Sequence, residues 1–201
     1  MQAGYMQSLQ VDTLLLLDTC SYLRLAKRIR PLLGVRFGQK NYVLTILPDV
    51  EKEVRGNQHL KNIFPWFDKT EIASERLSKQ VRLSVINKAE LDAATSILRA
   101  DVVANVTHYK NPPSPVDCRV LAFGQIREAI VVTDDLAMHQ LAEKFGLPVM
   151  HGHELLKKML TAKKITNELV REIYSALEMN GDLPKKWELD KEAVFGRKVF
   201  R

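Results

Sequence analysis

The segment Val11-Asp-Thr-Leu-Leu-Leu-Leu-Asp18 decides the fold. Its apolar run is short and stops abruptly at a polar residue, which is typical of a buried strand, here predicted over residues 11–17. A helix is predicted over residues 19–29, with Thr19 or Ser21 near its cap and Pro31 just beyond its end. The chain therefore starts with a buried strand that leads directly into a helix.

Strands and helices continue to alternate along the chain. We predict further strands at 41–47 and 129–133 and a short one near Met150. An α/β fold follows, with a central parallel sheet flanked by helices. Residues 56–84 are polar around an aromatic group, and residues 182–201 show no clear period, so that we expect a surface strap or a disordered tail there. Helices are predicted over residues 48–55, 69–79, 87–99 (capped by Asn87 with Glu90), 116–128, 135–145, 153–160 and 167–179.

The composition is that of an ordinary soluble globular protein. Of 201 residues, 46% are hydrophobic and 27% are charged. The longest strongly apolar run, Leu14 to Leu17, is far too short to cross a membrane, and it does not read as part of a signal peptide. The two cysteines, Cys20 and Cys118, imply no disulfide framework and are expected to be packing residues. A reducing, cytoplasmic location is therefore expected.

The positive charge of the chain is concentrated in one segment. The formal net charge is +6 and the sequence pI is about 9.3. No acidic residue occurs between Thr19 and Pro48, so this segment alone carries +6. A basic stripe of this kind suits a phosphate backbone, although a solvated helix face is the alternative interpretation. The stripe consists of Arg24, Lys27, Arg28, Arg30, Arg36 and Lys40.

Carboxylates follow two of the predicted strands. Asp18 comes directly after the first strand, and Asp135 follows the strand at 129–133. In open α/β sheets ligands bind beyond the carboxyl ends of the strands, so these residues are candidates for a functional site. The alternative is that each carboxylate caps the helix that follows it.

Asp117 is a third candidate. On a helical wheel its direction is shared by Val120, Leu121 and Gly124, so the side chain points toward the body of the protein. A buried carboxylate needs a partner, which a metal ion, an internal arginine or backbone amides could supply. A simple capping role near the first turn of this helix is the alternative.

A fourth carboxylate is expected from the helix at 48–55. Glu51 and Glu53 both flank the face formed by Val50 and Val54, and helical geometry does not choose between them.

Four motifs together resemble the PIN domain, the ribonuclease fold of VapC-type toxins and of several RNA-processing enzymes. The matching segments lie in the family's order within residues 11–152. They are Leu-Leu-Leu-Asp18-Thr-Cys, Pro48-Asp-Val-Glu-Lys-Glu53-Val, Val116-Asp117-Cys-Arg-Val-Leu-Ala122 and Val-Val-Thr133-Asp-Asp135.

The resemblance implies a catalytic and metal-binding site. It selects Glu53 over Glu51 and Asp135 over Asp134, and it makes Thr133 a supporting hydroxyl. The carboxylates would bind Mg²⁺ or Mn²⁺, the hard ions that oxygen ligands prefer. The implied function is an endoribonuclease that leaves a 5′-phosphate and a 3′-hydroxyl. The implied site is Asp18, Glu53, Asp117 and Asp135 with Thr133.

The resemblance also implies domains and partners. A PIN-like three-layer domain would span residues 1–160, with a longer helical region at about 56–111, and a C-terminal helix and tail would follow at 161–201. The partners are RNA, an antitoxin protein if the chain is the toxin of a toxin–antitoxin pair, and a second copy in a homodimer. A PIN-like RNA- or protein-binding module without turnover is the alternative. His151 and His153 are expected to be surface residues rather than metal ligands.

Overall fold

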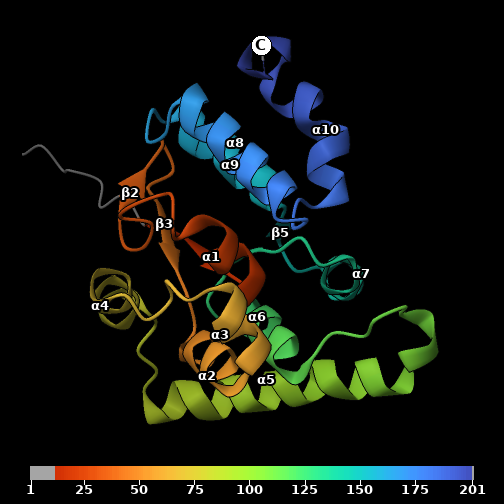
Figure 1. The fold of residues 1–201 in the computed structure, drawn as a ribbon. Coiled ribbons are helices and arrows are strands. Elements are labelled where there is room, and N and C mark those ends of the chain that lie inside the picture. Colours follow the sequence, from red (N-terminus) through yellow and green to blue (C-terminus); the bar gives the residue numbers. More distant parts are fainter. Residues whose placement is uncertain (1–11, 201) are drawn as a thin grey trace, which may run out of the picture.

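The computed structural model describes residues 12–200 and contains a five-stranded sheet of order β2-β3-β1-β4-β5 (Figure 1). β1 lies at the centre and pairs in parallel with β3 and β4, and β4 pairs in parallel with β5. The predicted α/β class is confirmed. The expectation of a wholly parallel sheet is wrong at one edge, where β2 pairs antiparallel with β3. The strands are β1 (Thr13–Leu17), β2 (Arg36–Phe37), β3 (Tyr42–Thr45), β4 (Ile130–Val132) and β5 (Val149–Met150).

Helices cover both faces of this sheet. In Figure 1, α8, α9 and α10 lie together on one side, and the long α5 lies with α6 on the other. The helices are α1 (Thr19–Leu25), α2 (Pro48–Gly56), α3 (Gln58–Ile63), α4 (Thr70–Lys79), α5 (Val85–Ala104), α6 (Pro115–Ile126), α7 (Leu136–Lys144), α8 (Gly152–Thr161), α9 (Asn167–Met179) and α10 (Lys185–Phe195), with short 3₁₀ turns at Val106–His108 and Arg197–Phe200.

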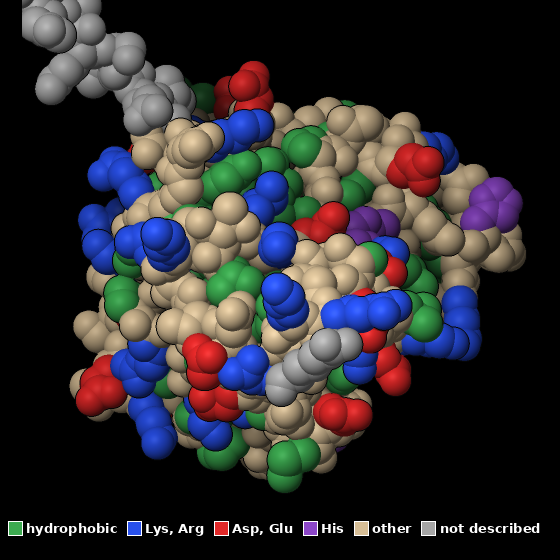
Figure 2. Space-filling view, turned by 90° about the horizontal axis from the view of Figure 1, so that it is seen from above, with side chains coloured by type: hydrophobic (Ala, Val, Ile, Leu, Met, Phe, Trp, Pro, Cys, Tyr) green, Lys and Arg blue, Asp and Glu red, His purple; other side chains and the backbone are tan. Residues whose placement is uncertain are grey.

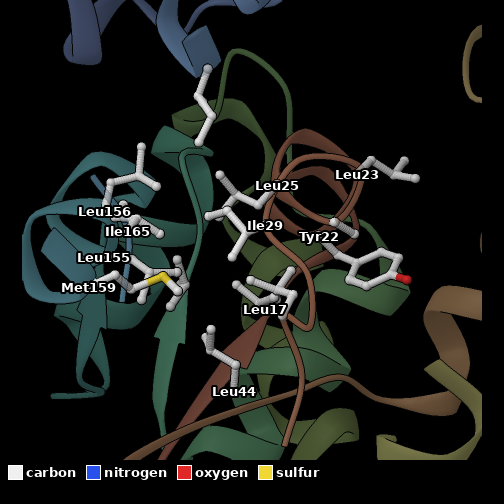
Figure 3. Packing of buried hydrophobic residues seen from close by; sticks show 14 of the residues in the cluster. Leu17, Tyr22, Leu23, Leu25, Ile29, Leu44, Leu155, Leu156, Met159 and Ile165 are labelled. Atoms are coloured by element: carbon white, nitrogen blue, oxygen red, sulfur yellow. The ribbon is translucent and has the colours of Figure 1, made fainter. Parts of the chain in front are cut away.

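The central strand supplies side chains to two separate cores. Leu15 and Leu17 pack with α1, α8, α9 and α10, whereas Leu16 packs with α5, α6 and α7. Successive side chains of a strand point to opposite faces, so a continuous leucine run fits a strand that is covered on both sides. Figure 3 shows the first core, where Leu17 and Leu44 face Leu25 from α1 and Leu155 from α8.

Two predicted helix caps are wrong, although α1 begins at Thr19 as predicted. Asp18, rather than Thr19 or Ser21, caps α1, because its Oδ1 accepts a hydrogen bond of 2.6 Å from the backbone N–H of Ser21. Ser84, rather than Asn87, caps α5, which begins at Val85. The predicted first strand began at Val11, which lies outside the described residues. The α1 helix ends at Leu25, four residues before the predicted end, and a turn follows.

The C-terminal segment is not a strap or a disordered tail. Residues 185–195 form α10, in which Trp187 is 1% exposed and packs into the same core as Leu15 and Leu17. The buried positions of this helix, Trp187 and Phe195, are eight residues apart, which leaves little periodicity to detect in the sequence. Side chains from both sides of residue 160 share this core, while the domain boundary proposed there stays a prediction; Arg201 lies outside the described residues.

The polar segment after α2 contains a helix that the sequence did not predict. This helix, α3, buries none of its side chains, so it has no apolar stripe to reveal it. In the described part of the chain, no helix combines the length and the hydropathy needed to span a membrane.

Candidate active site

A cleft of about 640 Å³ lies at the carboxyl ends of β1 and β4. Asp18 enters it from the end of β1, and Asp134 and Asp135 enter it from the end of β4. The other walls come from α1, α2, the start of α6 and α10. Its lining residues are Asp18, Thr19, Cys20, Arg24, Glu53, Ser114, Asp117, Asp134, Asp135, Leu136, Pro184, Lys185, Lys186 and Leu189.

Asp18 is the most deeply buried of the four predicted carboxylates, at 4% exposure. Burial raises its pKa to about 6, and the charge of Asp134 adds to this effect. Hydrogen bonds from Thr133 and Ser21 oppose the rise without cancelling it. Ionisation of the buried Asp18 carboxyl therefore costs free energy, and a bound cation would reduce that cost.

Asp117 lies at the start of α6 in a reciprocal capping arrangement. The backbone N–H of Ser114 donates to its Oδ2 at 2.8 Å, and the backbone N–H of Asp117 donates to Ser114 Oγ at 3.1 Å. Burial raises the pKa of Asp117, and the nearby charge of Asp135 raises it further. The capping role that was the alternative for Asp117 is therefore present, in a side chain that also lines the cleft.

The structure distinguishes the two glutamates of α2. Glu53 lines the cleft, where its Oε2 accepts a hydrogen bond of 2.5 Å from the hydroxyl of Thr19. Burial raises the pKa of Glu53, as does the charge of Asp117. Glu51 instead forms ion pairs with Arg76, which is fully buried, and with Arg55. The helical wheel left this choice open because it carries no information about Arg76, which comes from α4.

Thr133 and Asp135 follow the end of β4, and Asp135 lines the cleft. Asp135 caps α7, since its Oδ1 accepts hydrogen bonds from the backbone N–H groups of Ala137 and Met138 at 2.7 and 3.0 Å. The hydroxyl of Thr133 is buried and accepts a hydrogen bond from the backbone N–H of Asp135 at 3.1 Å. The Thr133 hydroxyl also donates to Met138 Sδ at 3.3 Å, and its contact with Asp18 lowers the pKa of that carboxyl. The role of Thr133 as a supporting hydroxyl stays a prediction.

Asp134 has a different environment from its neighbour. Its side chain is 3% exposed, and Oδ1 accepts hydrogen bonds from the indole of Trp187 and the backbone of Gly152. Arg24 lies 3.4 Å from Oδ2. Burial alone would raise the pKa of Asp134, but hydrogen bonds from His151, Trp187 and Gly152, together with the Arg24 charge, lower it. Asp134 therefore joins β4 to the C-terminal helices.

Capping explains part of this arrangement but not all of it. Asp18, Asp117 and Asp135 each satisfy backbone N–H groups at the start of a helix. Capping does not require that the three carboxylates share a cleft with Glu53, or that their charges raise one another's pKa values. That mutual repulsion is the feature that a cation would relieve.

The chemistry of these donors fits a hard cation, since all four are carboxylates. Their spacing is open: within residues 12–200, no three His, Cys, Asp or Glu side chains converge closely enough to hold an ion as they stand. Binding would thus require the carboxylates to rotate toward one another.

The six predicted RNA-binding residues fall into two groups. Arg24, Arg30 and Arg36 pair with Asp182, Glu71 and Asp12, respectively. In the described structure no ion pair involves the other three, which are Lys27, Arg28 and Lys40. Figure 2 shows that Lys and Arg side chains are spread over the face that carries α8, α9 and α10, with acidic groups between them.

Several residues of the cleft were not predicted. Lys185, Lys186 and Leu189 come from α10, whose position relative to β1 and β4 depends on contacts distant in sequence. Ser114 could have been found, because a serine three residues before an acidic residue is a capping signature. Cys20 is exposed in the cleft, so its interpretation as a packing residue is wrong, whereas Cys118 is buried as expected.

The expectation that His151 and His153 lie on the surface is also wrong. Both are buried, and their rings stack with that of His139, with centroids 4.0 Å apart for His139 and His151 and 5.5 Å apart for His151 and His153. Burial lowers the pKa of His139 and of His153, so that the neutral rings pack as part of the protein interior. Their burial results from the packing of α8 against α10 and Trp187.

No known family model matches the chain, and no curated protein shows significant sequence similarity to it. The PIN-domain resemblance therefore stays a prediction that rests on the four motifs.

Proposed function

We propose that this chain is a metal-dependent endoribonuclease with a PIN-like three-layer fold. The observation that carries the proposal is the meeting of Asp18, Glu53, Asp117 and Asp135 in one cleft, although they come from four separate segments. The same four residues are those that the motifs select. The raised pKa values of Asp18, Glu53 and Asp117 add support: burial is the main cause of each and the charge of a neighbouring acid adds to it, and a divalent cation would stabilise the charged forms.

Each side chain would have a defined role. Asp18 and Asp117 would hold Mg²⁺ or Mn²⁺, while Glu53 and Asp135 would complete the ligand shell or hold water molecules. When bound, the cation would lower the pKa of a water molecule and stabilise the charge that develops on the phosphodiester. Thr133 would keep Asp18 in position through its hydroxyl. The cleavage would leave a 5′-phosphate and a 3′-hydroxyl, as the resemblance implies.

A module that binds RNA or protein without turnover is the second candidate. Two observations favour it: the carboxylates do not converge as they stand among the described residues, and three of them cap helices. A role as the toxin of a toxin–antitoxin pair is a further part of the proposal, and a small acidic protein encoded beside this chain would support it.

Asp117→Asn tests the proposed function. Asn keeps the shape and the capping ability of Asp but loses the charge that holds a hard cation. We expect a folded protein that no longer cleaves a mixed RNA substrate in Mg²⁺ or Mn²⁺. Glu178→Gln, an exposed acid on α9, is the matched control and should retain activity. Full activity in Asp117→Asn would exclude the site, and a lower melting temperature would assign Asp117 a structural role instead.

A further inference from the structure

A second groove of about 620 Å³ borders the carboxylate cleft. The two share Cys20 and Arg24 on α1, so they are neighbours on the surface. One side of the second groove is α1, and the other side is formed by α3 and the residues that follow it. Its lining residues are Cys20, Leu23, Arg24, Lys27, Arg28, His59, Leu60, Ile63, Phe64, Pro65, Trp66, Leu177, Asn180, Gly181 and Asp182.

One wall of this groove is cationic. Lys27 is exposed and Arg28 is half-buried, and no acidic side chain in the part of the chain described forms an ion pair with either of them. The acid that lines the groove, Asp182, is bound to Arg24 at 2.8 Å. His59 is exposed on the opposite wall. The groove therefore offers two cations to an anionic ligand.

The other wall is apolar and partly aromatic. Ile63 is 52% exposed, and Pro65 is also exposed. Phe64 is half-buried and is held edge-on against Trp66, with ring centroids 5.9 Å apart. Trp66 itself belongs to the core, so Phe64 rests on a rigid base. This wall therefore presents apolar and aromatic surface to the groove.

A single strand of nucleic acid has the chemistry that fits both walls. Its phosphates can follow the cations while its unpaired bases lie against apolar and aromatic side chains. A duplex stacks its base faces internally, so it could use the cations but not the Phe64 wall. The groove also borders the carboxylate cleft at Cys20 and Arg24, next to where the proposed cleavage would occur.

We propose that this groove, defined by Lys27, Arg28, Ile63 and Phe64, binds a single-stranded segment of RNA and directs it to the carboxylate cleft. The inference rests on the proposed function for its substrate class. It assigns substrate binding to two of the six basic residues of the stripe and to an aromatic residue that the motifs do not include.

Binding of a short fluorescent RNA in EDTA tests the inference, because no cleavage can occur without metal. Lys27→Glu/Arg28→Glu should weaken single-strand affinity by about tenfold or more and reduce the salt slope by about 1.4, as for the loss of two phosphate contacts. Phe64→Ala should weaken it by about tenfold through lost stacking. Lys88→Glu/Lys198→Glu is the matched control, since it makes the same charge change at exposed residues outside both the groove and the basic stripe. The same strand in a duplex should bind wild type more weakly.

Several results would overturn the inference: groove variants that bind like the control, a duplex that binds as tightly as the single strand, or binding of an acidic peptide but not of RNA. A thermal melt of each variant checks that it is folded. If Lys27→Glu/Arg28→Glu does not fold, Lys27→Gln/Arg28→Gln is used in its place. These experiments also distinguish failure of this inference from failure of the proposed function. A protein that binds RNA in this groove but does not cleave it retains the inference, and one that cleaves without using the groove loses only the inference.

Discussion

The indole N–H of Trp187 donates a hydrogen bond of 2.7 Å to Oδ1 of Asp134, and this bond joins α10 to the end of β4. Both side chains are almost fully buried. Asp134 lies next to Asp135 in the chain, so the contact also helps to hold Asp135, which is one of the four carboxylates of the proposed site. The buried carboxylate of Asp134 therefore connects α10 to the end of β4, beside the cleft.

Trp187→Phe should destabilise the protein by about 1–3 kcal/mol, because the buried carboxylate loses a donor while the aromatic packing largely remains. Urea unfolding measures the loss. Leu189→Ala on the same helix is the control, since Leu189 is exposed and its removal should change little. Equal stability of Trp187→Phe and wild type would show that the hydrogen bond contributes nothing to the fold.

Arg24→Ala should lower stability by about 2–4 kcal/mol, because it leaves the buried Asp134 and the half-buried Asp182 without their cation. Lys27→Ala, one helical turn away, should stay within about 0.5 kcal/mol of wild type. The pair therefore separates a structural arginine from a solvent-facing lysine of the same segment. Similar urea midpoints for the two variants would contradict the assignment.

Asp18→Asn should stabilise the metal-free protein at neutral pH. The folded pKa of Asp18 is about 6 against an ordinary value of 3.8, so its ionisation opposes folding above pH 6 and has no effect below about pH 4. The raised pKa corresponds to at most about 3 kcal/mol. Thermal melts in EDTA should show a gain that grows from about pH 4 to pH 6 and then stays level to pH 8. A gain that is constant across this range would rule out the buried charge as its cause.

Mn²⁺ should raise the melting temperature of the wild-type protein. A ligand at about 100 times its Kd contributes about 2.7 kcal/mol when it binds only the folded state. For a domain of this size that corresponds to a shift of about 5–10 °C. The shift should be much smaller in Asp117→Asn and unchanged in Glu178→Gln. An identical midpoint with Mn²⁺ and with EDTA in the wild type would argue against a metal site.

Much of the fold could be predicted from local patterns. The run before Asp18 and the run before Asp135 identify β1 and β4, because a strand covered on both faces needs consecutive apolar residues. The same runs place two carboxylates at one edge of the sheet. The strand β2 has only two residues, and α3 buries none of its side chains, so neither leaves a pattern in the sequence.

The rest of the site depends on contacts between distant residues. Trp187 reaches Asp134 across 53 positions, and nothing in the C-terminal sequence reveals that partner. Likewise, the charge run from Arg24 to Lys40 does not show that Asp182 binds Arg24 or that Glu71 binds Arg30. Helical geometry alone could not separate Glu51 from Glu53, whereas the buried Arg76 beside Glu51 does so.

The position of α10 has a consequence for the order in which the cleft is assembled during synthesis. Domains emerge from the ribosome from the N-terminus onward. Asp18, Glu53, Asp117 and Asp135 are made first, but the wall formed by Lys185, Lys186 and Leu189 begins fifty positions after Asp135. A nascent chain that has not yet extruded this helix lacks one side of the cleft and the Trp187 support of Asp134. An enzyme that hydrolyses RNA with this cleft would therefore have an incomplete active site until α10 had been translated from its own messenger and had emerged.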